Sequence, residues 1–276
     1  MSKADVLFVN TVEKILNEGY SDENQEVRPL WPDGVPAHTI KTFGVVNTYD
    51  LQDEFPALTL RPTALKSAFD EILWIWQKKS NNVHDLRSHI WDAWADESGS
   101  IGKAYGYQLA KQYQFAQGKM DQVDNILWLL KNTPASRRIM AHLYNFDDLK
   151  DMHLEPCCWS VTLNVTGDTL NMILNQRSQD TLVANNWNVC QYALLLMMFA
   201  QVSGFKAGKL IHIISDCHIY DRHISILREM IQRPQYPAPK VWLNPEVKDF
   251  YQFKVEDLHV EDYKTNEQIR NIPVAV

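Results

Sequence analysis

The sequence predicts an α/β (α+β) protein in which a large mixed β-sheet packs against helices. Helical and strand-like hydrophobic patterns alternate along all 276 residues, with no repeat, linker or change of composition between them. One helical segment is apolar nearly all round, which is typical of a helix enclosed by the rest of the protein. We therefore expect a single domain over residues 1–276, built from the sheet, a buried central helix and surrounding helices.

The N-terminal half predicts helices joined by polar connections. Residues 4–18 repeat apolar side chains at helical spacing, and short β-like runs lie around 39–46. A strongly apolar helix is expected after Thr63, a residue type that favours the N-cap position. Another helix is expected over 121–131, because its pattern stops just before Pro134.

A change to alternating hydrophobicity beyond Ser136 predicts a β-hairpin. Its strands cover 158–165 and 169–177, joined by the turn sequence Thr-Gly-Asp. The polar side of these strands carries Ser, Thr and Asn, with no charge before Arg177. A solvent-facing side would normally carry Lys or Glu, so we expect this face to meet another polar surface, such as a partner subunit.

The C-terminal part contains the proposed central helix and several shorter elements. The helix covers 189–203 and is followed by a strand over 209–214. A further helix is expected over 221–233, and short strands near Val241 and Phe253.

Composition excludes several classes of function. The net charge of −7 disfavours a DNA-binding protein, although a few local arginines can still hold an anionic phosphate. The longest apolar run is too short to cross a bilayer, and the N-terminus lacks a signal-peptide layout. The four cysteines include no CxxC pair, which argues against a zinc site and for reduced thiols. We therefore expect a cytoplasmic protein that binds no metal, membrane or DNA.

Candidate reactive residues are weak signals one at a time. An isolated cysteine such as Cys157 is most often buried and inert, and the pair Arg137-Arg138 most often lies in solvent. Glu71 would ordinarily point to solvent, and His218 would ordinarily be structural. Together, however, a thiol beside arginines suits nucleophilic catalysis on an anionic substrate, because a cation lowers a thiol pKa. These residues do not identify the substrate.

Several blocks, all in the same order, resemble the thymidylate synthase family. The most distinctive is Asn175-Gln176-Arg177-Ser178-Gln179-Asp180, followed by Asn188 and then Tyr192-Ala193-Leu194-Leu195. The other blocks are Glu71-Ile72-Leu73-Trp74, Ile90-Trp91-Asp92 with Trp94, Tyr105-Gly106, Ser136-Arg137-Arg138, Pro156-Cys157, Asp216-Cys217-His218-Ile219-Tyr220 and Pro273-Val274-Ala275-Val276. The resemblance runs from about Arg28 to the C-terminus. Each block is weakly specific, and the ordered set is very specific.

The resemblance implies a methyltransferase that converts dUMP to dTMP. The carbon and the hydride would both come from 5,10-methylenetetrahydrofolate, which leaves as dihydrofolate, so no metal is required. Cys157 would add to C6 of the uracil ring, and Glu71 would organise water for proton transfer. The implied catalytic residues are Cys157, Glu71, Tyr105, Asn188, Arg177 and Asp216.

The resemblance also implies two binding sets and a homodimer. Arg137 and Arg138 would reach the phosphate of dUMP from the partner subunit, and the amide of Asn188 would read the base. The implied dUMP residues are Arg28, Arg137, Arg138, Gln176, Arg177, Ser178, Asp180, Asn188, His218 and Tyr220. The implied folate residues are Ile90, Trp91, Trp94, Leu154, Asp180, Trp187 and Ala275, with the C-terminal tail closing over both ligands.

The sequence departs from the family pattern at several positions. Cys158 follows the nucleophile where relatives often have His, and Ala184 replaces a Gly near the pyrimidine. Trp187 replaces a Phe, Ala64 replaces a folate-binding His, and the segment 29–34 replaces a Thr-Gly-Thr-Gly loop after Arg28.

Two alternatives stay open. One is a dUMP or dCMP hydroxymethylase of the same fold, and the other is a non-catalytic homologue that binds pyrimidine nucleotides or RNA. Trp91 and the intact C-terminal tail favour hydride transfer in a dry site, and Asn188 disfavours cytosine. The joint presence of Cys157, Glu71 and Arg177 disfavours pure binding.

Overall fold

The fold is organised by a six-stranded sheet whose strand order is β1-β2-β8-β7-β6-β5. This order comes from the computed structural model, which describes all 276 residues. Neighbours β7 and β8 run parallel and the other pairs antiparallel, so the predicted mixed sheet is confirmed. Its strands are β1 (Tyr20–Ser21), β2 (Thr39–Asp50), β5 (Met140–His142), β6 (Cys158–Thr166), β7 (Thr169–Asp180) and β8 (Lys206–Tyr220). Two small two-stranded antiparallel sheets pair β3 (Tyr113–Phe115) with β4 (Gly118–Met120) and β9 (Lys240–Leu243) with β10 (Leu258–Glu261).

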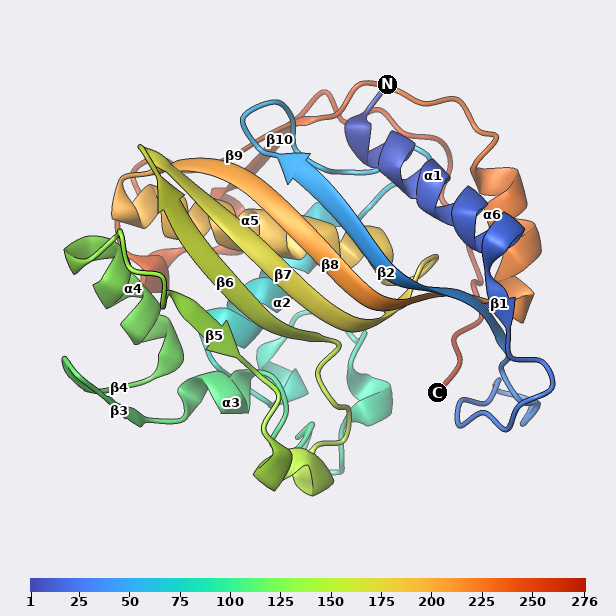
Figure 1. Cartoon of the computed structure of the whole chain (residues 1–276), viewed down its shortest axis with the longest axis horizontal. Coiled ribbons are helices and arrows are strands. Elements are labelled where there is room, and N and C mark those ends of the chain that lie inside the picture. The colour runs from blue at the N-terminus through green and yellow to red at the C-terminus, as the bar shows by residue number, and fades with distance from the viewer.

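Helices pack behind the sheet in the view of Figure 1, with α5 and α2 crossing beneath its central strands. The helices are α1 (Lys3–Glu18), α2 (Leu65–Trp76), α3 (Gly106–Ala110), α4 (Gln122–Asn132), α5 (Asn185–Ser203) and α6 (Ile224–Met230). α5 contacts α2, β7 and β8 and is buried along most of its length, which confirms the expected central helix. It ends at Gly204, whose φ of 76° suits glycine at the end of a helix.

One hydrophobic core holds the layers together. It is a single cluster of 60 buried residues that runs from α1 to β10. In its centre, Trp76 of α2 packs edge-to-face against Tyr192 and Phe199 of α5, and Phe199 stacks on Phe250. These contacts join segments that are far apart in the chain, so the helix layer and the C-terminal segment share one core.

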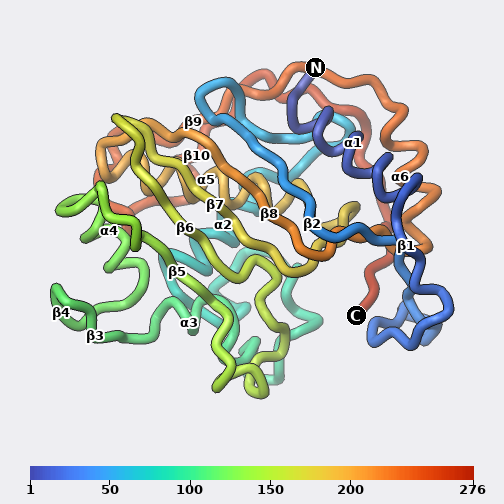
Figure 2. Tube along the Cα trace, in the orientation of Figure 1, coloured from blue at the N-terminus to red at the C-terminus, as the bar shows by residue number.

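The other face of the sheet is left uncovered in the single chain, and no segment crosses it in Figures 1 and 2. Thr48, Ile211, Ile173 and Thr162 are aligned side by side across β2, β8, β7 and β6. This row carries no charged side chain, and Val46 nearby is 59% exposed. The open face is therefore uncharged along its centre, and partly apolar.

Some local expectations are wrong. Thr63 does not cap α2, because its hydroxyl bonds to Asn186 and the cap position is Ala64. Phe253 is not in a strand but follows a 3-10 turn, and the expected helix over 221–233 is a 3-10 turn followed by the short α6. The strand expected over 209–214 is confirmed, and β8 continues beyond that range at both ends.

Candidate active site

Only one of the four thiols can meet a ligand. Cys157 is partly exposed, whereas Cys158, Cys190 and Cys217 are buried, and all four are unpaired. Cys157 directly precedes β6, and its carbonyl accepts a hydrogen bond of 2.9 Å from the Arg177 N–H of β7. Exposure therefore separates Cys157 from its neighbour, which the sequence alone could not do.

The Arg177 side chain is hydrogen-bonded to the backbone of the two residues before Cys157. Its Nε donates to the Pro156 carbonyl at 3.1 Å, and its Nη2 donates to the Glu155 carbonyl at 2.8 Å. These two bonds hold a guanidinium against the residues that precede Cys157. The thiol and the cation expected from the sequence are thus brought together.

The sequence predicts that nearby arginines lower the pKa of the Cys157 thiol, but in the structure this pKa is raised. Burial is the largest influence and raises the pKa of the thiol. Arg177 and Arg28 lower the pKa, and Glu155 raises it further. The net shift is upward, so the arginines act in the expected direction but do not outweigh burial in the free protein.

Glu71 is buried beside two tryptophans, so the solvent-facing alternative is wrong. The residue is 4% exposed, and its two carboxylate oxygens accept the indole N–H groups of Trp91 at 3.0 Å and Trp187 at 2.7 Å. Burial raises the pKa of Glu71, while the hydrogen bonds from the indoles and the nearby Gln191 amide oppose that rise. The carboxyl group is therefore fixed in place and disposed to hold a proton.

Tyr105 contacts both Cys157 and Trp91, the tryptophan that binds Glu71. Its hydroxyl accepts a hydrogen bond of 3.1 Å from the Cys157 N–H, and its ring lies 5.0 Å from the ring of Trp91. Its backbone has a φ of 44°, a strained value for a tyrosine. The next residue must be glycine, because a Cβ on Gly106 would lie 2.1 Å from the Ser80 carbonyl oxygen.

A parallel strand pair brings together several of the residues that the sequence predicts to bind the nucleotide. The register of β7 and β8 places Ser178 beside Asp216 and Asp180 beside His218. Asp216 accepts a hydrogen bond of 2.8 Å from His218 Nδ1, and the His218 ring packs against Tyr220 at 5.1 Å. Two sequence blocks about forty residues apart therefore form one polar surface.

Asn188 extends this surface from the first turn of α5. Its Oδ1 accepts a hydrogen bond of 3.1 Å from Gln176 Nε2, and its Nδ2 donates to Gln191 Oε1 at 3.1 Å. Both ends of the amide are therefore held before any ligand arrives. The sequence suggested Asn188 and Gln176 as separate candidates but not the contact between them.

His223 contacts both Asp180 and the C-terminal tail. Asp180 Oδ1 accepts the backbone N–H groups of Leu182 and Val183 and lies 3.5 Å from His223 Nδ1. His223 Nε2 donates to the Pro273 carbonyl at 2.8 Å. The last residue, Val276, exchanges two backbone hydrogen bonds with Leu30, so the tail that contains Ala275 rests on the loop after Arg28.

The predicted folate residues are only partly assembled. Trp91 packs against Trp94 at 5.6 Å and both Trp91 and Trp187 reach Glu71. Ile90 is 43% exposed, and Leu154 is partly buried against the core. The aromatic part of the wall therefore exists in the free protein.

Three predicted arginines remain outside these contacts. Arg28, Arg137 and Arg138 are exposed, and none of them pairs with a carboxylate of the chain. Arg137 and Arg138 lie just before β5, whereas Arg28 precedes the loop that meets the tail. Of the three, Arg28 acts on Cys157 through its charge.

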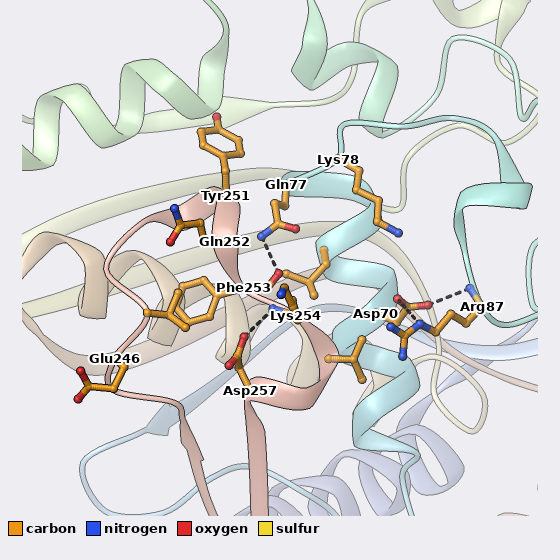
Figure 3. A pocket seen from close by; sticks show the side chains of 13 residues that line it. Asp70, Gln77, Lys78, Arg87, Glu246, Tyr251, Gln252, Phe253, Lys254 and Asp257 are labelled. Atoms are coloured by element: carbon orange, nitrogen blue, oxygen red, sulfur yellow. Dashed lines mark hydrogen bonds and ion pairs between the residues drawn. The ribbon is translucent and has the colours of Figure 1, made fainter.

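A separate pocket of about 610 Å³ lies between α2 and residues 246–257 (Figure 3). Its polar groups already bind one another: the Arg87 N–H donates to Asp70, and Gln77 donates to the Phe253 carbonyl. It contains none of the predicted site residues. Elsewhere, no group of three or more His, Cys, Asp or Glu side chains is placed to hold a metal ion, and no helix is long and apolar enough to cross a membrane.

Comparisons with known proteins agree with the resemblance in the sequence. The family model described as thymidylate synthase matches residues 7–276. The chain is 43% identical to a thymidylate synthase of Bacillus subtilis subsp. natto and 44% identical to one of Bacillus licheniformis, each over 274 residues and 98% of both chains. The solved structure of a thermostable thymidylate synthase A from Bacillus subtilis matches with a TM-score of 0.94 and 42% identity, over 99% of each chain.

Proposed function

Because the chain belongs to the thymidylate synthase family, whose members are folate-using methyltransferases, we propose that it converts dUMP to dTMP. In this reaction 5,10-methylenetetrahydrofolate supplies both the carbon and the hydride and is released as dihydrofolate. Residues 1–276 act as one catalytic domain. The observation that carries the proposal is the partly exposed Cys157, held between Arg177 and Tyr105 in a site that also contains buried Glu71.

Cys157 is the nucleophile that adds to C6 of the uracil ring. A thiolate is required, and the raised pKa of Cys157 keeps the thiol largely protonated in the free protein. Arg177 lies beside it and favours the ionised form, while Arg28 and Ser178 join Arg177 in holding the phosphate. Addition at C6 pushes electron density to C5, which then acts as the carbon nucleophile.

Proton transfer is assigned to Glu71 and Tyr105. Glu71 has an upward-shifted pKa and is fixed by two indole N–H groups, so it can hold a proton near the base and orient water. The Tyr105 hydroxyl lies next to Cys157 and accepts its N–H, which suits a role in removing the C5 proton through water.

The base and sugar are bound by the surface that β7, β8 and α5 form. Asn188 and Gln176 recognise the uracil edge, and His218 and Tyr220 hold the deoxyribose hydroxyl. Asp216 orients His218 through their 2.8 Å hydrogen bond. Asp180, Ile90, Trp91, Trp94, Leu154, Trp187 and Ala275 surround the folate, and the tail excludes water when both ligands are bound.

We further propose a homodimer through the open face of the sheet. The row from Thr48 to Thr162 is uncharged, and Phe146 and Trp159 expose aromatic surface beside Arg177. An uncovered surface of this kind suits a partner. The partner would supply Arg137 and Arg138 to the phosphate, which explains two exposed arginines without carboxylate partners. Reduced thiols fit the proposed location in the cytoplasm.

One experiment separates this function from the two alternatives. The protein is mixed with dUMP tritiated at C5 and 5,10-methylenetetrahydrofolate, and tritium release is followed together with the absorbance of dihydrofolate. Release with dihydrofolate is the expected result. Release without dihydrofolate would indicate a hydroxymethylase, and no release would indicate a non-catalytic binding protein.

A further inference from the structure

A buried histidine outside the proposed substrate contacts begins a chain of hydrogen bonds that passes through Asn188, the residue proposed to read the base. His212 of β8 is fully buried, and its Nε2 lies 2.7 Å from Gln176 Oε1. Gln176 Nε2 then donates to Asn188 Oδ1 at 3.1 Å, and Asn188 Nδ2 donates to Gln191 Oε1 at 3.1 Å. Within this chain, Gln176 and Asn188 each accept through the amide oxygen and donate through the amide nitrogen, and Gln176 Nε2 also donates to the Ser178 carbonyl at 3.0 Å.

The direction of this chain depends on the tautomer of His212. Burial lowers the pKa of His212 to about 3, so the ring is neutral at pH 7 and carries one N–H. Its Nδ1 is buried without a hydrogen-bond partner. A buried N–H without a partner is costly and rare, so the proton belongs on Nε2 and His212 donates to Gln176.

Two neighbours support the same orientation of the amides. Gln179 Nε2 also donates to Gln176 Oε1, at 3.3 Å, so this oxygen accepts two hydrogen bonds. At the other end, the Gln191 amide lies near Glu71 and lowers its pKa, although its Nε2 forms no hydrogen bond of regular geometry. If Gln176 rotated by half a turn, its NH₂ group would face the N–H groups of both His212 and Gln179.

The orientation of the Asn188 amide decides which base fits. Uracil offers an N–H at N3 and an acceptor at O4, whereas cytosine offers an acceptor at N3 and an NH₂ at C4. An amide that matches uracil matches cytosine only after its oxygen and nitrogen exchange places. The donor from Gln176 keeps Oδ1 of Asn188 where it is, and this opposes the exchange.

We propose that His212 is a positioning residue that makes the site select uracil over cytosine. It does so without touching the nucleotide, because its N–H fixes Gln176 and Gln176 fixes Asn188. This inference rests on the proposed function, since it assumes that Asn188 faces the base of dUMP.

Two substitutions at His212 form a matched test. The amide nitrogen of His212→Gln reaches about as far as Nε2 and can still donate to Gln176, whereas that of His212→Asn reaches only as far as Nδ1. The dissociation constants of dUMP and dCMP are measured by calorimetry for both variants and the unaltered protein. We expect the preference for dUMP to fall by about tenfold to a hundredfold in His212→Asn, because a buried donor is lost. In His212→Gln it should change by less than about threefold. Equal preferences in the three proteins would overturn the proposal.

Two further measurements keep the test decisive if His212→Asn does not fold. In the unaltered protein, ¹⁵N NMR should show His212 as the Nε2–H tautomer from pH 5 to 8, and an Nδ1–H tautomer would overturn the proposal. Gln176→Glu keeps the acceptor for His212 but removes the donor to Asn188, so it should move the preference toward dCMP. If the unaltered protein binds no dUMP, the proposed function fails, whereas the NMR result still reports on the hydrogen-bond chain.

Discussion

The two ends of the candidate site differ in how much of each a single chain completes. At the Glu71 end, both carboxylate oxygens are bonded to indoles of the same chain, and the aromatic wall is in place. At the Cys157 end, Arg177 is bonded to two carbonyls, but Arg28 and the pair at 137–138 remain exposed and unpaired. The Glu71 end is therefore preorganised within one chain. The Cys157 end keeps exposed arginines without carboxylate partners, and we propose that these bind the phosphate of dUMP, two of them from a second subunit.

This difference has a physical reason. A buried carboxyl group must find donors within the fold, because leaving it unbonded is costly. A guanidinium on the surface is solvated by water, so leaving it without a protein partner costs little free energy. The predictions below test this contrast, beginning with the largest expected effect.

Replacing the thiol should remove the reaction without removing the binding surface. Cys157→Ser should lower turnover by at least about a thousandfold, because the hydroxyl is a much poorer nucleophile at C6. Tritium release measures turnover, and calorimetry should still detect dUMP. The matched control is Cys158→Ser, whose side chain is 3% exposed and should leave turnover within about tenfold. Loss of turnover in the control alone would mean that the nucleophile is misassigned.

Glu71→Gln tests the Glu71 end of the site. Turnover should fall by about a hundredfold or more, because the proton-transfer group is lost, while dUMP binding changes little. The raised pKa of Glu71 also makes a prediction about stability. The folded protein binds this proton more tightly than the unfolded chain, so the contribution of Glu71 to stability declines as pH rises above 4.5.

The stability of Glu71→Gln relative to the unaltered protein should therefore increase with pH from about 4 upward. Urea titrations of both proteins at several pH values measure this difference. A difference that stays constant with pH would show that Glu71 has no raised pKa in the folded protein.

At the Cys157 end, loss of the exposed arginines should weaken the binding of dUMP. Arg137→Ala/Arg138→Ala should raise the KM for dUMP by about tenfold to a hundredfold, because charged hydrogen bonds to phosphate are lost. Mixing its subunits with those of Cys157→Ser should then restore activity. A mixed dimer has one intact site, so random exchange would give up to about a quarter of the unaltered activity. No recovery, with subunit exchange confirmed by mass, would show that the arginines act within their own chain.

The sequence was most informative where neighbouring residues decide the structure. Helical and alternating periods identified α1, α5 and the hairpin of β6 and β7, since these patterns reflect burial directly. The resemblance predicts Cys157 as the nucleophile, and the structure adds that it is the only one of the four cysteines that is partly exposed.

Contacts between distant segments could not be predicted in the same way. Trp91 and Trp187 bind Glu71 from different parts of the chain, so no local sequence pattern predicts these hydrogen bonds. The Thr63 cap failed for a related reason, because the hydroxyl found a tertiary partner in Asn186. The link from Gln176 to Asn188 was also missed, although both residues had been singled out.

The smallest effect concerns Glu155, whose carbonyl binds Arg177 and whose carboxylate accepts a hydrogen bond of 2.5 Å from the Tyr144 hydroxyl. Its negative charge raises the pKa of Cys157. Glu155→Gln removes that charge and leaves the carbonyl in place, so the pKa of Cys157 should fall and the thiol should be alkylated faster at a given pH. Iodoacetamide rates from pH 6 to 10 measure the midpoint, which should move to lower pH. An unmoved midpoint would mean that burial and the arginines alone set the ionisation of Cys157. Nearby carboxylates would then have no part in the difference between the two ends of the site.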